Sequence, residues 1–346
     1  MIEVRLHGVG DLRVGEAERP VPGPGESLVR VSAVGVCGSD LHWFTAGSIG
    51  DATLDRPLVP GHEFGGIVEA GPLAGRRVAV DPAIPCGTCD RCREGNHNLC
   101  PTVRFAGHGA CDGALREYLV WPSHLLHPVP DTLSDEAAAL LEPLGVAIHA
   151  FDLGHVRLGA SVAVVGCGPI GLMLLQVARA GGAGPVVAVE PLPHRRAAAA
   201  GYRLGPAIDP GDDLDATLAD TGAPGGVDVA FEVAGTDEAV TVAMRLVRPG
   251  GRVVLAGIPY PDSTTFPASL ARRKGLTLAM VRRMRDSYPR ALRLIGAGLV
   301  DLDSLVTHRY PLTDAAKAFA AAVSRTGIKV VIEPQPRSAP DMNPRT

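Results

Sequence analysis

The feature that most limits the possible folds of this chain is a glycine-rich turn near its middle, Gly166-Cys167-Gly168-Pro169-Ile170-Gly171. The turn has the form G-x-G-x-x-G, follows a short β-branched run at residues 162–165 and opens a helix-like segment at 169–180. The first glycine permits a tight turn, the second lets the backbone approach a pyrophosphate, and the third lets helix and strand pack closely. The start of the helix then offers free N–H groups to the phosphates. We therefore expect Gly166, Gly168, Pro169, Ile170 and Gly171 to bind a dinucleotide.

An acidic residue stands where the second strand of such a unit should end. Glu190 follows Gly171 by nineteen residues, close to the spacing of about 20 expected for the residue that binds the adenosine ribose. Its carboxylate would repel a 2′-phosphate, which favours NAD over NADP. Arg195 and Arg196 come next, and an arginine in this place can accommodate a 2′-phosphate. We count Arg195 among the cofactor-binding residues.

The wider pattern predicts two kinds of domain. Strand-like and helix-like segments alternate from residue 161 onward, which is typical of a parallel sheet, whereas the first 145 or so residues read mainly as short strands and loops. A length of 346 residues also predicts about two domains. The net charge of −4 and an aromatic content of 4 % do not support nucleic acid or an anionic membrane as a partner. The N-terminus lacks the apolar region of a secretory signal, and we expect a cytoplasmic protein.

Four of the seven cysteines lie within fifteen residues, as Cys86-x2-Cys89-x2-Cys92-x7-Cys100. Clustered cysteines in a cytosolic chain indicate a metal site before disulfides. Four thiolates satisfy zinc completely and leave no open position, so the expected role is structural. Two alternatives are an iron–sulfur cluster, although the x7 gap departs from ferredoxin spacings, and four unrelated surface thiols.

A fifth cysteine, Cys37, lies in Val36-Cys37-Gly38-Ser39-Asp40-Leu41-His42, and Gly61-His62-Glu63 follows twenty-five residues later. One cysteine, one histidine and nearby carboxylates can hold zinc with one open position, as a catalytic site requires. Taken alone, this pair is weak evidence for a metal site, and a buried apolar cysteine with a core histidine is the simpler explanation.

Together these motifs resemble the zinc-dependent medium-chain dehydrogenase/reductases over about residues 3–333. The resemblance rests on Cys37-Gly38-Ser39-Asp40, Gly61-His62-Glu63, the four-cysteine lobe and the Gly166–Gly171 turn, in that order. It implies an α/β fold in which a GroES-like β-barrel catalytic domain is formed by both ends of the chain, residues 1–147 and 276–346. A Rossmann domain, a doubly wound parallel sheet at 148–275, is inserted between them.

Within that family the chain is similar to the polyol branch, which includes sorbitol, xylitol and L-idonate dehydrogenases. The residues that carry this likeness are Cys37–His42, the segment 141–149 and the segment 306–312. The resemblance implies a catalytic zinc held by Cys37, His62 and Glu63, with Glu142 as a fourth or exchanging ligand; Glu63 would otherwise orient the site. It also places Arg283 near the substrate. Met284 replaces a frequent aromatic residue, and residues 108–111 differ as well, which leaves the substrate open.

The implied reaction is reversible oxidation of a secondary alcohol of a polyol, sugar acid or aminocyclitol to a ketone, with hydride transfer to NAD. Zinc lowers the pKa of the hydroxyl, and Ser39 takes the proton and passes it through the cofactor ribose to His42. Glu63 and Glu142 are counted as catalytic too. Alternatives are a non-catalytic protein that kept the NAD and zinc sites, a zinc-free reductase, and a threonine-type amino-alcohol dehydrogenase. The family resemblance implies a homodimer or homotetramer.

Overall fold

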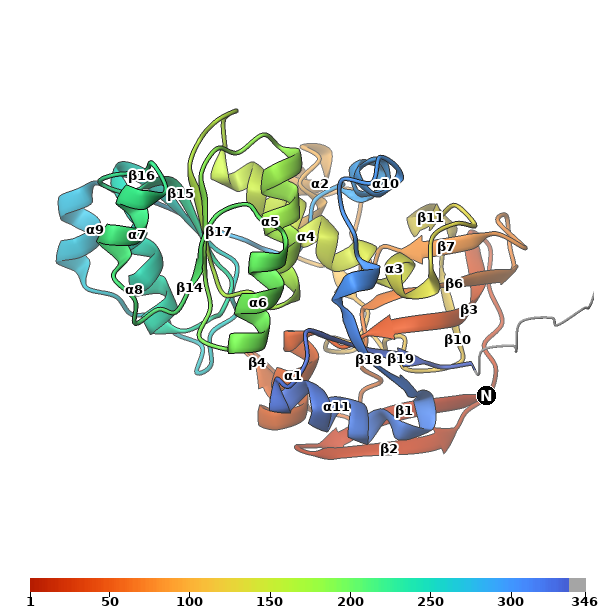
Figure 1. Cartoon of the computed structure of the whole chain (residues 1–346). Helices are drawn as coiled ribbons and strands as arrows, with labels where there is room; N and C mark the ends of the chain where they lie inside the picture. Colours follow the sequence, from red (N-terminus) through yellow and green to blue (C-terminus); the bar gives the residue numbers. More distant parts are fainter. Residues whose placement is uncertain (336–346) are drawn as a thin grey trace, which may run out of the picture.

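Two β-sheets organise residues 1–335, the part of the chain that the computed structural model describes (Figure 1). The first is a parallel sheet of six strands in the order β14-β13-β12-β15-β16-β17. Its strands are β12 (Val162–Val165), β13 (Val186–Val189), β14 (Ala207–Ile208), β15 (Val227–Glu232), β16 (Val247–Leu255) and β17 (Thr277–Met280). The order reverses at β12, which has β13 on one side and β15 on the other. A reversal of this kind leaves a crevice beyond the carboxyl ends of the strands, where ligands bind.

Helices cover both faces of this sheet, on the left in Figure 1. They are α4 (Leu141–Gly154), α5 (Pro169–Ala180), α6 (Pro193–Gly201), α7 (Leu214–Asp220), α8 (Asp237–Leu246) and α9 (Ala268–Lys274). Val162 and Val164 belong to the apolar cluster that includes α4 and α5, whereas Ala163 and Val165 belong to the one that includes α7 and α8. Successive side chains of a strand point to opposite faces, so a strand covered on both faces is apolar throughout. The predicted doubly wound sheet is confirmed.

The second sheet has seven strands and combines both ends of the chain. Along its path the order is β11-β7-β6-β3-β19-β18, and β10 pairs with β3. The strands are β3 (Glu26–Gly35), β6 (Glu63–Ala70), β7 (Arg77–Val80), β10 (Tyr118–Pro122), β11 (Leu126–Pro128), β18 (Val306–Pro311) and β19 (Lys329–Glu333). The late strand β19 pairs antiparallel with the early strand β3, with Val331 opposite Gly35. The first domain therefore resumes after the parallel-sheet domain.

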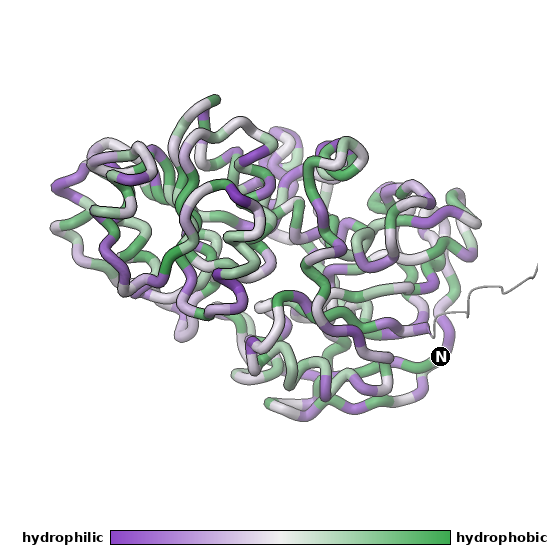
Figure 2. The backbone as a smooth tube through the Cα atoms, viewed as in Figure 1, coloured by the Kyte–Doolittle hydropathy of each residue, from purple (hydrophilic) through white to green (hydrophobic). Residues whose placement is uncertain are grey.

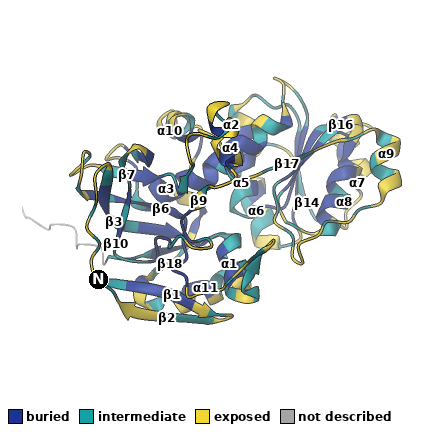
Figure 3. Cartoon of the chain, turned by 180° about the vertical axis from the view of Figure 1, so that it is seen from behind, coloured by how far each residue is buried: buried dark blue, intermediate teal, exposed yellow. Residues whose placement is uncertain are grey.

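Short elements complete the described structure. They are the strands β1 (Ile2–Gly8), β2 (Asp11–Glu16), β4 (Ser48–Ile49), β5 (Ala52–Thr53), β8 (Ala83–Ile84) and β9 (Arg104–Phe105), the helices α1 (Gly38–Ala46), α2 (Asp90–Arg93), α3 (Asp135–Ala139), α10 (Tyr288–Gly296) and α11 (Ala315–Ser324), and the turns of 3-10 helix at His97–Leu99, Ser123–Leu125, Asp303–Leu305 and Leu312–Asp314. Hydrophobic residues follow the strands of both sheets (Figure 2), while β2 and α9 are largely exposed (Figure 3). None of the helices in residues 1–335 is long and apolar enough to cross a membrane.

Helix α4 joins the two lobes and runs across one of the predicted domain limits. Its buried residues share one apolar cluster with Ala33 of the catalytic lobe and Phe231 of the parallel sheet, so the predicted limit at 147/148 falls inside a continuous helix. The parallel sheet runs on to Met280, past the predicted limit at 275. The sequence pattern missed β17 because this edge strand is mostly exposed and lacks the buried apolar run of its neighbours. Residues 336–346, assigned to the catalytic domain by prediction, lie outside the described residues.

Candidate active site and metal centres

Strand pairing brings together three predicted ligands that are distant in sequence. Cys37 lies just before α1, and His62 and Glu63 lie at the start of β6. Gly35 at the end of β3 pairs with Glu63, so the two segments end side by side. The sulfur of Cys37, a ring nitrogen of His62 and a carboxylate oxygen of Glu63 all lie within 4.8 Å of one another. A Cβ atom on Gly35 would stand 2.1 Å from Glu63 Oε2, so only glycine leaves room for this carboxylate.

Asp40 orients this group, a role that sequence reasoning missed. Its buried carboxylate accepts hydrogen bonds from the backbone N–H groups of Cys37 at 2.9 Å and Gly61 at 3.2 Å, and it lies 3.4 Å from His62 Nδ1. A carboxylate at Nδ1 fixes the ring and leaves Nε2 as the ligand atom. Burial opposes ionisation of Asp40, but His62 and the two N–H groups outweigh it, so the pKa of Asp40 lies below its ordinary value. Asp40 was visible in the Cys37 motif, but nothing in the motif indicated its partner.

Lys329 is the second residue that the sequence left unassigned. Its ammonium lies 2.5 Å from Glu63 Oε2, donates to the carbonyl of Val36 at 2.9 Å, and is 2 % exposed. Burial lowers the pKa of Lys329, but Glu63 and the neighbouring acidic groups outweigh it, so that the pKa is raised. One feature of the sequence could have indicated this role: Lys329 begins an otherwise apolar strand. A lysine in such a strand is expected to be buried, and a buried lysine requires a partner.

This donor set fits zinc. A thiolate, an imidazole and a carboxylate are the usual zinc donors, and three protein ligands leave one position open, as in catalytic sites. Glu142 of α4 lies outside the group of three whose ligand atoms are close together, although it is buried and interacts electrostatically with His62 and Glu63. Burial is the main reason that the pKa of Glu142 is raised to about 8. The structure thus brings together Cys37, His62 and Glu63, with Glu142 beside them.

The two predicted proton carriers both lie on α1. Ser39 Oγ stands 3.4 Å from His62 Nε2. His42, one turn further along, is half-buried and bonds to the backbone of Ile258, in the loop that follows β16. Its ring centroid is 6.0 Å from that of Tyr260 in the same loop. Burial lowers the pKa of His42. Helix α1 therefore reaches from the ligand group to the dinucleotide domain.

The glycine turn has the shape that its sequence predicts. It leaves β12 and becomes α5, with Gly168 before the helix and Pro169 at its first turn. Gly166 has φ +100°, and a Cβ atom on Gly171 would stand 1.9 Å from the carbonyl oxygen of Gly166. Both positions therefore require glycine. Ile170 packs against the α4–α5 apolar cluster.

Glu190 and the arginines after it are held by backbone groups. Glu190 accepts hydrogen bonds from the N–H groups of Cys167 at 2.6 Å and Leu192 at 3.0 Å. Arg196 donates to the carbonyl oxygens of Glu190 and Pro191 and pairs with Asp209. Arg195 donates instead to the carbonyl of Gly327, in the catalytic lobe, through Nε at 3.3 Å and Nη2 at 3.1 Å. Arg195 therefore bridges the two lobes beside the glycine turn.

The four clustered cysteines form a second, separate group. The sulfurs of Cys86, Cys89, Cys92 and Cys100 all lie within 4.8 Å of one another. Backbone N–H groups of Cys86 and Cys89 point at the sulfurs of Cys100 and Cys86, each at 3.3 Å. Hydrogen bonds from the backbone of Thr88 and Cys89 lower the pKa of Cys86 to about 5. This donor set fits a closed zinc site of four thiolates.

Arg283 is linked to the Cys37–His62–Glu63 group through Phe105. Its guanidinium lies over the ring of Phe105, 4.0 Å from the centroid, and the Phe105 centroid is 5.3 Å from that of His62. Nη1 of Arg283 is buried and has no hydrogen-bond partner among the described residues. Burial and the neighbouring Arg282 lower the pKa of Arg283 to about 10. A buried donor with no partner is costly, which makes this atom a candidate contact for a bound polar group.

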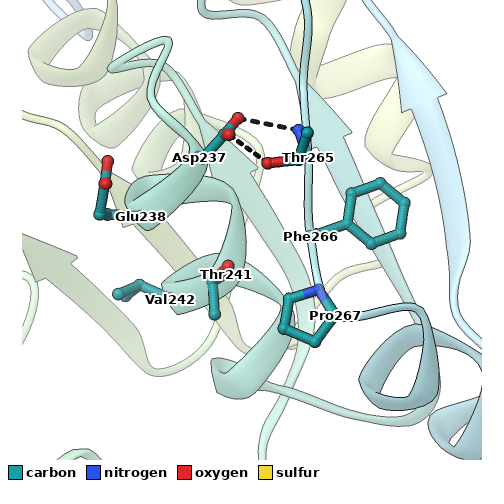
Figure 4. A pocket seen from close by; sticks show the side chains of 7 residues that line it. All are labelled: Asp237, Glu238, Thr241, Val242, Thr265, Phe266 and Pro267. Carbon is teal, nitrogen blue, oxygen red and sulfur yellow. Dashed lines mark hydrogen bonds between the residues drawn. The ribbon is translucent and has the colours of Figure 1, made fainter.

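A different hollow lies on the dinucleotide domain and contains none of the predicted site residues. It is formed by Asp237, Glu238, Thr241 and Val242 of α8 with Thr265, Phe266 and Pro267 of the loop before α9 (Figure 4). Asp237 accepts hydrogen bonds from the N–H group of Thr265 at 2.9 Å and from its hydroxyl. These bonds attach the loop to the start of the helix.

Comparisons with known proteins agree with this geometry. Residues 23–131 match the alcohol dehydrogenase GroES-like domain, and residues 169–297 match the zinc-binding dehydrogenase domain. The chain is 33 % identical to a sorbitol dehydrogenase of Bacillus subtilis, over 95 % of this chain and 96 % of that one. It resembles the crystal structure of L-idonate 5-dehydrogenase from Escherichia coli (TM-score 0.85, 28 % identity, 96 % and 97 % covered). It also resembles a zinc-binding dehydrogenase of Sinorhizobium meliloti bound to NADP (TM-score 0.86, 32 % identity, 96 % and 99 % covered).

Proposed function

Since this chain belongs to the polyol branch of the zinc-dependent medium-chain dehydrogenases, we propose that it oxidises a secondary alcohol of a polyol, sugar acid or aminocyclitol to a ketone. The electron acceptor is NAD(P), as in the family. The observation that carries the proposal is the group of half-buried Cys37 with buried His62 and Glu63. Phe105 packs beside His62 and carries the guanidinium of Arg283 over its ring. One reaction converts the alcohol and NAD⁺ into the ketone, NADH and a proton.

Each residue of the site has a distinct task in this reaction. Cys37, His62 and Glu63 would hold zinc, which when bound lowers the pKa of a hydroxyl, while the nicotinamide accepts the hydride. Asp40 keeps the His62 ring oriented, and Lys329 balances the charge of Glu63. Ser39, next to His62, takes the hydroxyl proton, and His42, one turn further along α1 and only half-buried, releases it to water. Glu142 is the remaining buried carboxylate beside the ligands and serves as an exchanging ligand.

The surroundings of Arg283 favour a substrate with several oxygen atoms. Its buried Nη1 has no protein partner, and a guanidinium donates well to hydroxyl and carboxylate oxygens. A polyol carries hydroxyl groups next to the reacting carbon, and a sugar acid carries a carboxylate as well. The related sorbitol and L-idonate dehydrogenases have names that belong to these two substrate classes.

NAD is the proposed cofactor, in preference to NADP. The carboxylate of Glu190 stands beside the glycine turn and would repel a 2′-phosphate. The two arginines that would attract one are engaged elsewhere, Arg195 with Gly327 and Arg196 with backbone carbonyls and Asp209. We expect a higher kcat/KM with NAD than with NADP.

A homodimer or homotetramer built through the parallel sheet is also proposed. Strand β17 ends the sheet and has no neighbour on its outer side among the described residues, and it exposes Met280. An uncovered edge strand readily pairs with another copy. Light scattering should give a mass two or four times the 35.9 kDa of one chain. The proposed location is the cytoplasm, because thiolate metal sites persist in a reducing compartment.

The proposed activity can be tested with a substrate panel. Sugar alcohols, aldonates, cyclitols and amino alcohols are offered to the zinc-loaded enzyme, and NADH or NADPH formation is recorded. We expect turnover of at least one polyol, aldonate or cyclitol. Turnover of amino alcohols alone would favour the threonine-type alternative, and no turnover by protein with both zinc sites filled would favour a non-catalytic role.

A further inference from the structure

The four-cysteine lobe, residues 86–100, is hydrogen-bonded to the segment that contains Arg283. Asn98, 5 % exposed and two residues before Cys100, donates from its side-chain amide to the carbonyl oxygen of Arg282 at 3.0 Å. The same amide nitrogen lies 3.4 Å from Nε2 of His149, a buried residue of α4. Both amide hydrogens therefore have acceptors, and the side chain is locked between α4 and the backbone at residue 282.

A second contact holds the other side of Arg283. Nε of Arg285 donates to the carbonyl oxygen of Gly95, also in the four-cysteine lobe, at 2.9 Å. Met284, between the two contacts, packs against α4, where a Cβ atom on Gly145 would stand 2.4 Å from its sulfur. The lobe thus holds the backbone carbonyl immediately before Arg283 and the side chain of Arg285 after it.

The backbone held in this way is strained. Arg283 has φ +54°, one of four non-glycine residues with positive φ in residues 1–335. This conformation costs about 1–2 kcal/mol for a residue with a side chain. The carbonyl of Arg282 and the N–H of Arg283 share one peptide plane, so the bond from Asn98 restrains the plane that sets this φ. A return to negative φ would turn the guanidinium away from Phe105.

We propose that Asn98 is a positioning residue for the substrate: it couples the four-cysteine lobe to Arg283 and keeps the free Nη1 of Arg283 aimed at the polar groups of a polyol or sugar acid. This inference rests on the proposed function for the nature of the substrate. The lobe that would hold the structural zinc thereby takes part in substrate recognition without touching the substrate.

The test compares Asn98→Asp with the matched control Asn96→Asp. Aspartate has the size of asparagine but no N–H donors, so Asn98→Asp removes the bond to the carbonyl of Arg282. The Asn96 amide makes only a weak surface contact with Glu94 at 3.4 Å. With D-sorbitol as the probe, we expect Asn98→Asp to lower kcat/KM about 10- to 100-fold, the usual effect of losing a hydrogen bond to a charged group. With 2-propanol, which has no second polar group, the change should stay below about 3-fold.

A double-mutant cycle separates positioning from general damage. If Asn98 acts through Arg283, Asn98→Asp should add little to the loss that Arg283→Ala already causes, because coupled residues are not additive. Zinc content is measured for every variant, and Asn98→Ala, which offers no new metal ligand, replaces Asn98→Asp should the latter lose zinc. Additive losses, or equal losses for D-sorbitol and 2-propanol, would overturn the proposal.

Crystal structures of the wild type and of Asn98→Asp provide a readout that needs no substrate. We expect Arg283 to adopt negative φ in the variant and its guanidinium to leave the Phe105 ring. An unmoved Arg283 would overturn the inference even if the enzyme oxidises polyols. Conversely, a wild type that oxidises no polyol or sugar acid would disprove the proposed function, while the structural comparison still decides whether Asn98 positions Arg283.

Discussion

The two candidate metal centres differ in how the chain builds them. The four-cysteine group comes from one stretch of fifteen residues, is partly exposed, and contains sulfur donors only. The Cys37–His62–Glu63 group is buried more deeply and contains three types of donor atom. Two further residues support it: Asp40, three residues after Cys37, contacts His62, and Lys329, near the far end of the chain, contacts Glu63. A local loop can close around a metal by itself, whereas a site with an open position needs a surrounding fold to shape it. We therefore expect the first centre to affect stability most and the second to affect turnover most.

The largest expected contrast comes from removing one sulfur from each centre. Cys37→Ala should lose one zinc and lower kcat at least about 1000-fold, because Lewis-acid chemistry supplies several kcal/mol of the activation energy, while the thermal midpoint changes little. Cys100→Ser should also lose one zinc, but it should lower the midpoint by about 5 °C or more. Metal analysis, calorimetry and steady-state kinetics measure these effects. A Cys37→Ala variant that lost a zinc and kept its turnover would show that this centre is not catalytic.

A substitution of Lys329 tests whether the buried Cys37–His62–Glu63 centre depends on the charges around it. Lys329→Met leaves the Glu63 carboxylate buried without a counter-charge, which costs about 3–5 kcal/mol of unfolding free energy in metal-free protein. The loss should be smaller with zinc bound, since the ion itself compensates the carboxylate. Lys317→Met is the matched control, because Lys317 is 73 % exposed and its surface pair with Asp314 contributes less than about 1 kcal/mol. Urea unfolding of both forms measures the difference, and equal losses with and without zinc would refute this account of Lys329.

The smallest expected contrast concerns residues next to the ligands. Asp40→Asn weakens the hold on the His62 ring and should lower zinc affinity about 10- to 100-fold. Thr88→Ala removes a single exposed hydroxyl contact with the Cys86 sulfur at 3.7 Å and should change affinity of the four-cysteine centre by less than about 3-fold. Competition with a chelator measures both affinities. Similar losses of zinc affinity at the two centres would mean that the depth of burial does not determine how strongly neighbouring residues affect zinc binding.

The parts of the fold that were predictable are those with a local cause. The glycine turn, its preceding strand and its following helix were predicted because the conformational needs of Gly166 and Gly171 are visible in the sequence. Ser134 caps α3 by a local contact of the same kind, since its hydroxyl accepts a hydrogen bond from the N–H group of Ala137. Strand β17 was missed because an exposed edge strand has no apolar run. Helix α4 packs in both lobes and runs across the predicted limit at 147/148.

In the candidate site, too, the features with a local cause were predictable and those that depend on distant contacts were not. The spacing of Cys86, Cys89, Cys92 and Cys100 was sufficient to predict a centre of four thiolates, and family resemblance was needed to join Cys37 to His62 and Glu63. No sequence pattern indicated the partners of Lys329 or Asn98, which lie 266 and 184 residues away. Contacts over such separations depend on which strands and segments meet, and a single sequence does not record that.

By itself, the sequence determined the dinucleotide turn, the four-thiolate lobe and the resemblance to zinc-dependent polyol dehydrogenases, because each depends on residue types at short, fixed spacings. Only the tertiary structure decided that β19 completes the sheet begun by β3 and so brings Lys329 to Glu63. It alone decided that the cysteine lobe holds the strained backbone at Arg283. The physical reason is that a buried charge or a strained φ is stable only when the rest of the fold supplies its partners.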